Sequence, residues 1–147
     1  MSFKKWLHEN RVRKHETSRE EITNLFKIVE RDIRDAGMRS ISDDARFVIA
    51  YNAALKLCTI LLHASGYRSS AVGAHYYTIE SLPLILGPEA RGDADYLDQC
   101  RERRNHAEYD YTEVVVESDV DELIKFVTEL KIHSIKWLKE NRPDLLF

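Results

Sequence analysis

The feature that most restricts the fold is a broad apolar stripe in the middle of the chain. Its members recur at intervals of three and four residues, the spacing of one face of an α-helix. They are Phe47, Val48, Tyr51, Ala54, Leu55, Cys58, Leu61 and Leu62. Ser42, followed by Asp43 and Asp44, provides an N-cap and two negative charges at the end where the helix dipole favours them. The pattern predicts a central core helix that begins near Ser42 and ends before Gly66.

Start and stop signals predict further helices on both sides of this segment. Ser18-Arg19-Glu20-Glu21 has the form of a capping box, in which side chain and backbone satisfy each other's donors, and Gly37 marks the end of that helix. Pro83 should kink or end the next segment, because proline removes a backbone donor. The remaining predicted helices run from Ala71 to about Leu86, from Ala94 to about Tyr111, and from Ser118 to a stop at Pro143.

The composition favours an all-helical fold. Only 5 of the 147 residues are glycine and 3 are proline, which leaves little turn chemistry for β-hairpins. The length suits one domain with a continuous core. We therefore predict an all-α, single compact up-and-down bundle of about five helices at residues 17–140, preceded by a basic N-terminal arm at residues 1–16. The arm, with Trp6 among its lysines and arginines, suits either steering of RNA or packing of Trp6 on a partner subunit.

Charge and cysteine content narrow the function classes. The formal net charge is -3, so the protein as a whole has no field that would attract nucleic acid or an anionic membrane, and any nucleic-acid contact must come from a local patch. Cys58 and Cys100 fall inside apolar helical patterns without the paired spacing of a zinc site, which predicts buried reduced thiols. We expect a cytoplasmic protein with no membrane segment, no metal and no cofactor.

The segment from Asp98 to Asp110 has the densest chemistry in the chain. It contains three arginines, a histidine, an asparagine and a tyrosine within a few helical turns. At about 100° per residue, Leu97 and Cys100 lie on its apolar side. The opposite side forms a polar wall of Arg101, Glu102, Asn105, His106 and Tyr109.

Arg101 and His106 on this wall suit the chemistry of RNA cleavage. They lie five positions apart, about 7.5 Å along the helix axis, a gap that a long guanidinium can close. An imidazole can take the proton from a ribose 2′-hydroxyl, and a guanidinium can hold the scissile phosphate. The alternative is a solvated helix face in which these side chains only form local ion pairs.

The motif Arg101-x4-His106, late in a domain of about five helices, resembles the signature of the HEPN superfamily, whose better-known members are homodimeric, metal-independent ribonuclease toxins. The similarity extends from Thr17 to about Leu138, and it includes the Gly66-Tyr67-Arg68 turn and the Leu82-Pro83 step. It implies a bundle that dimerises so that two motif helices share one composite RNA site.

The resemblance assigns roles residue by residue. It makes His106 and Arg101 the catalytic pair, and it gives Arg104, Asn105 and Tyr109 contacts with RNA. A polar residue, often asparagine, usually follows the family's arginine, whereas this chain has Glu102. If the Arg-Asn pair is instead Arg104-Asn105, Tyr109 occupies the place of the histidine and the catalytic base is missing.

Several alternatives stay open. Many HEPN toxins work beside a nucleotidyltransferase-type antitoxin, which is therefore a candidate partner. A non-catalytic module that binds nucleotide, RNA or a protein through the same face is the second hypothesis, and a scaffold bundle is the third. His63 suits a helix end, His75 beside Tyr76 and Tyr77 suits either the core or base stacking, and His15 shares a face with His8 without a third metal ligand.

Overall fold

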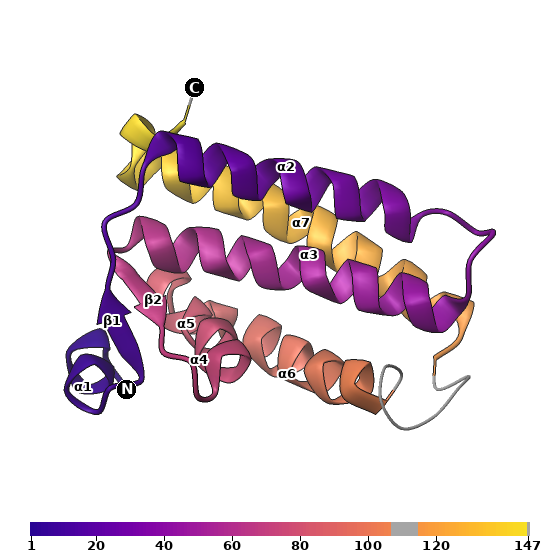
Figure 1. Cartoon of the computed structure of the whole chain (residues 1–147), viewed down its shortest axis with the longest axis horizontal. Helices are drawn as coiled ribbons and strands as arrows, with labels where there is room; N and C mark the ends of the chain where they lie inside the picture. The colour runs from indigo at the N-terminus through magenta and orange to yellow at the C-terminus, as the bar shows by residue number, and fades with distance from the viewer. Residues whose placement is uncertain (107–114, 147) are drawn as a thin grey trace.

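The chain folds as a helical bundle, as predicted. The computed structural model describes residues 1–106 and 115–146. Its long helices, which alternate in direction, are α2 (Arg19–Ala36), α3 (Asp43–Ala64), α6 (Arg91–Asn105) and α7 (Glu117–Asn141). Figure 1 shows α3 between α2 and α6, and α3 also packs along α7. The all-α fold class is thereby confirmed.

The central helix α3 forms the middle of the core. Phe47, Tyr51, Leu57, Cys58 and Leu61 each expose 1% or less of their surface. Such burial on every side explains why the apolar positions extend beyond a single narrow stripe. This helix is also long and apolar enough to cross a membrane, but 67% of its most apolar window is buried inside the bundle.

Helix starts follow the predicted caps in two of three cases. The hydroxyl of Ser18 accepts a hydrogen bond from the backbone N–H of Glu21 at 3.1 Å, and Ser42 caps α3 in the same way. The prediction that Ser118 opens the last helix is wrong by two positions. Val116 is the N-cap of α7, because the Asp119 carboxylate accepts a hydrogen bond from its backbone N–H at 3.0 Å.

The segment that Pro83 was predicted to kink or end consists of two short helices. They are α4 (Ala74–Glu80) and α5 (Leu82–Leu86), and the short 3-10 helix η1 (Pro88–Ala90) leads from α5 into α6. Pro83 lies in the first turn of α5, where a missing backbone donor costs nothing. The buried hydroxyl of Ser81 donates to the carbonyl of Thr78 at 2.6 Å, and this hydrogen bond satisfies that carbonyl at the break between the two helices.

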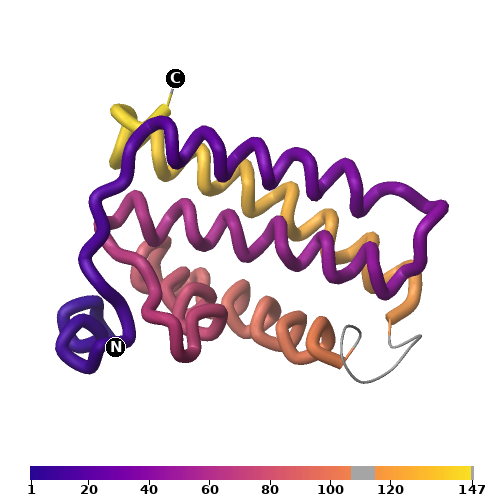
Figure 2. Tube along the Cα trace, in the orientation of Figure 1, coloured from indigo at the N-terminus to yellow at the C-terminus, as the bar shows by residue number. Residues whose placement is uncertain are grey.

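The first residues, predicted as a basic N-terminal arm, fold onto the end of the bundle. Helix α1 (Phe3–His8) leads into strand β1 (Val12–Lys14), which pairs antiparallel with β2 (Tyr67–Ser69) after α3. Figure 2 shows this unit at the end of the bundle where α2 begins. Trp6 is 2% exposed and contacts the ring of Tyr77 edge-on at 5.2 Å, so it packs within its own chain.

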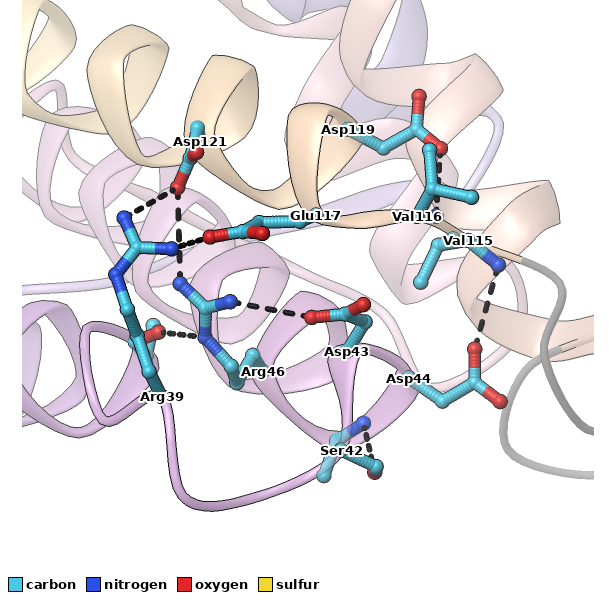
Figure 3. Close-up of polar contacts among 12 residues, drawn as sticks. Arg39, Ser42, Asp43, Asp44, Arg46, Val115, Val116, Glu117, Asp119 and Asp121 are labelled. Atoms are coloured by element: carbon cyan, nitrogen blue, oxygen red, sulfur yellow. Dashed lines mark hydrogen bonds and ion pairs between the residues drawn. The ribbon is translucent and has the colours of Figure 1, made fainter.

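A polar network closes the other end of the bundle (Figure 3). The Arg46 guanidinium, 2% exposed, donates to the carbonyl of Ala36 at 2.7 Å and pairs with Asp43 at 3.1 Å. It also lies 3.6 Å from Asp121 of α7. One buried side chain therefore ties the last turn of α2 to the first turns of α3 and α7. The chain ends beyond α7 with the 3-10 helix η3 (Pro143–Leu145).

Candidate functional site

Helix α6 presents one face to the core and one to solvent, as the sequence predicted. Ala94, Leu97 and Cys100 are buried against the core, with at most 3% of their surface exposed. Burial raises the pKa of the Cys100 thiol to about 11, so it stays protonated at neutral pH. The Arg91 guanidinium at the start of α6 pairs with the buried Glu80 at the end of α4. This pair holds the two helices together.

Two of the three clustered arginines have contacts that serve the bundle. Arg103 donates to the Asp119 carboxylate of α7 at 2.9 Å, and its guanidinium lies 5.6 Å from the ring centre of Phe47. The Arg104 guanidinium lies 5.9 Å from the ring centre of Tyr51 in α3. Both side chains are thus directed toward neighbouring helices, where a cation and an aromatic face attract each other.

Arg101 is placed differently. Its Nε donates to the Asp98 carboxylate at 2.9 Å, and its guanidinium lies 6.0 Å from the ring centre of Tyr76 in α4. Within residues 1–106 and 115–146, Asp98 is its only ion-pair partner. The two terminal nitrogens can therefore donate to a phosphate in the two-pronged geometry that guanidinium groups favour.

Arg101 borders a surface cavity of about 370 Å³ between α4 and α6. Its lining comprises Ala71, Gly73, Ala74, His75, Tyr76, Arg101 and Asn105. Gly73 has a φ of +71° at the start of α4, and a side chain there would meet the ring of Tyr77 at 3.2 Å. A glycine is required at this bend, and it leads directly into His75 and Tyr76.

His75 adds a neutral imidazole to this cavity. Its Nδ1 lies 3.4 Å from the hydroxyl of Tyr51. Burial lowers the pKa of His75, and the positive charges of Arg104 and Arg101 lower it further. A ring that stays neutral near pH 7 can accept a proton from a bound ligand.

The predicted site residues are only partly brought together. Arg101 and Asn105 line the cavity, and Arg104 reaches Asn105 with a hydrogen bond of 3.3 Å. His106 is exposed just beyond the last residue of α6, and the described part of the cavity lining does not include it. Tyr109, and the predicted continuation of this helix to Tyr111, lie outside the described residues.

No family model, curated protein or solved structure matches this chain. The resemblance to the HEPN superfamily therefore rests on the sequence alone, on Arg101, His106 and the residues around them. His75 and Tyr76 are the site residues that the sequence left undecided. Their pattern suits a core helix equally well, and only the packing of α4 beside α6 places them next to Arg101.

A second polar cluster joins the segment between β1 and α2 to the helices α2 and α3, at the end of the bundle near α1. The Glu21 carboxylate, read from the sequence as half of a capping box, accepts hydrogen bonds from His15 and His63 at 2.8 Å each and from Thr17 at 2.7 Å. Burial alone would raise the pKa of Glu21, but these hydrogen bonds outweigh it and lower the pKa to about 2.

This shift predicts an acid-sensitive contribution to stability. Because the pKa of Glu21 falls from 4.5 to about 2 on folding, its contribution is complete above pH 4.5 and is lost as pH falls toward 2. About a third of the side chain is exposed, so we expect only about 1 kcal/mol after solvent screening. Urea unfolding at several pH values, with a chelator present, should show a shallower pH dependence for Glu21→Gln. The exposed neighbour variant Glu20→Gln should follow the wild type, and equal slopes for all three proteins would contradict the assignment.

Proposed function

We propose that this chain is an endoribonuclease of the HEPN type that works as a homodimer and needs no metal for the reaction. The observation that carries the proposal is the cavity between α4 and α6, where Arg101 and Asn105 lie beside the ring of Tyr76 and the imidazole of His75. A guanidinium with free terminal donors, an amide and an aromatic face are the groups that bind phosphate and stack an unpaired RNA base.

In this proposal each group has one role. The terminal nitrogens of Arg101 hold the scissile phosphate and neutralise the charge that develops on it. Asn105 positions the sugar-phosphate backbone, and Tyr76 stacks on a base. His106 takes the proton of the ribose 2′-hydroxyl, whose oxygen attacks the neighbouring phosphorus. The bond from phosphorus to the 5′-oxygen of the next nucleotide breaks, and the departing 5′-oxygen takes a proton from water. Because His106 lies outside the described cavity lining, we infer that it is supplied across a two-fold axis from the second copy.

Replacing each histidine identifies the base. His106→Ala should lower the rate of RNA cleavage by about 100-fold or more, the usual effect of losing a general base. It should also relieve toxicity when the protein is expressed, with folding intact. His75 is the second candidate for this role, because its neutral imidazole lies beside Arg101. If His75→Ala abolishes cleavage and His106→Ala does not, His75 is the base and the role assigned to His106 is wrong.

A second function is favoured by one observation. Since His106 does not line the described cavity, the site can bind RNA or a nucleotide without cleaving it. In that case, wild-type protein binds labelled single-stranded RNA in fluorescence anisotropy, Arg101→Ala binds it more weakly, and no fragments form. We propose a nucleotidyltransferase-type antitoxin as a partner only if the protein is a ribonuclease, and not if it is a binding module.

Tyr76 provides a test of the cavity itself. Tyr76→Ala should weaken binding of single-stranded RNA by about 10-fold, because base stacking on an aromatic ring contributes about 1–3 kcal/mol. The side chain is 39% exposed, so stability should change little. Anisotropy titrations of wild type, Tyr76→Ala and Tyr76→Phe measure the effect. Phenylalanine should preserve binding, and equal affinity for all three proteins would show that RNA does not use this cavity.

A further inference from the structure

Three metal-ligand side chains from separate segments converge near the start of α2. His15 lies between β1 and α2, Glu21 in the first turn of α2, and His63 in the last turn of α3. The nearest donor atoms of all three, one from each residue, lie within 4.8 Å of one another. His15 Nε2 and His63 Nδ1 are each 2.8 Å from the same oxygen, Glu21 Oε1.

The main chain fixes these side chains in position. The backbone N–H of His15 donates to the carbonyl of Gly66 at 2.9 Å, and the N–H of Gly66 donates to the carbonyl of His63 at the same distance. Gly66 has a φ of +96°, a conformation that suits glycine. Thr17 holds the Glu21 carboxylate through its hydroxyl. Ligands that are oriented before the ion arrives bind it with less loss of entropy.

We propose that His15, Glu21 and His63 bind one divalent transition-metal ion, with zinc the best fit. Two imidazoles and a carboxylate are a known ligand set of four-coordinate zinc sites that keep one position for water. In a tetrahedral site, ligand distances of about 2.0–2.2 Å place neighbouring donor atoms about 3.3–3.6 Å apart, so the three side chains need only small movements from their present contacts. The two histidines are 19% and 17% exposed, which leaves access for the ion and a water molecule.

The ion would have a role separate from RNA cleavage. It would join the unit of α1 and β1 to the end of α3, next to the last residue pair of the small sheet, Lys14 with Tyr67. This junction lies at the end of the bundle where α2 begins. Arg101 lies near the C-terminal end of α6, and this end of the helix points toward the opposite end of the bundle (Figure 1). The metal-site proposal therefore does not depend on the proposed ribonuclease function, and the two are tested separately.

The test is calorimetric titration of the chelator-treated full chain with zinc chloride near neutral pH. We expect one ion per chain, and Glu21→Gln and His63→Gln should each lower the affinity by at least about 10-fold, the lower bound for disturbing such a site. Acid should weaken binding, because protons compete for both imidazoles. The matched control is His8→Gln, which alters an exposed histidine of α1 and should bind zinc like the wild type.

A second measurement needs no variant. Cobalt(II) added to the wild-type protein should give the intense visible absorption of a four-coordinate ion. A weak spectrum like that of free cobalt, or zinc affinity unchanged in both Glu21→Gln and His63→Gln, would overturn the proposal. If the proposal fails in this way, the cluster only links the segments through hydrogen bonds. Circular dichroism of each variant shows whether it is folded.

Discussion

Replacing Arg101 by alanine should reduce RNA cleavage by about 100-fold or more, a loss as large as that expected from His106→Ala. In the proposed mechanism its guanidinium is the group that neutralises the scissile phosphate. Its present contacts are with Asp98 at 2.9 Å and the ring of Tyr76, both partly exposed. The loss of a partly exposed ion pair costs under about 1 kcal/mol, so the variant should stay folded.

The comparison needs a control that removes the same charge elsewhere. Lys27 is exposed on α2, which lies on the other side of α3 from α6 (Figure 1). Lys27→Ala should cleave RNA like the wild type, which separates a specific phosphate contact from a general change in net charge. Initial rates on a mixed-sequence single-stranded RNA measure all three proteins. If Arg101→Ala cleaves as fast as Lys27→Ala, the assigned role of Arg101 is wrong.

The largest effect on stability should come from Arg46. Arg46→Ala removes a side chain that is 2% exposed and leaves the carbonyl of Ala36 without its buried donor. Its partners Asp43 and Asp121 are about half exposed and can return to water, so their desolvation adds little. We expect a loss of roughly 3 kcal/mol from the cavity and the unsatisfied carbonyl. The melting temperature should fall by about 10 °C.

Arg39 offers a matched control within the same network (Figure 3). Arg39 pairs with Glu117 and Asp121, so it reaches the start of α7 as Arg46 does. Unlike Arg46, it has 60% of its side chain exposed. Arg39→Ala should cost under about 1 kcal/mol, because exposed ion pairs contribute little. Chemical denaturation of the two variants tests the contrast. Equal losses would show that burial of Arg46 does not set its contribution.

The features that could be predicted from the sequence are those that local interactions decide. The apolar stripe of α3 predicts a buried helix whichever elements pack against it. The hydroxyls of Ser18 and Ser42 cap helices by accepting hydrogen bonds from backbone N–H groups three positions later. The buried side of α6 follows in the same way from helical spacing, which places Leu97 and Cys100 together.

What could not be predicted depends on partners far away in the chain. The position of Tyr76 beside Arg101 depends on how α4 packs against α6, where Glu80 pairs with Arg91. Glu21 has the sequence context of a capping box, yet its carboxylate bonds to His63, 42 positions later. No spacing rule within one helix contains that information.

The most direct test of the account is the chemistry of the RNA ends. Mixed-sequence single-stranded RNA is incubated with wild-type protein in the presence of a chelator, and the fragments are analysed by mass spectrometry. Attack by the 2′-hydroxyl predicts fragments that end in a 2′,3′-cyclic phosphate, and none from Arg101→Ala. Absence of fragments from wild-type protein, or the same fragments from Arg101→Ala, would contradict it.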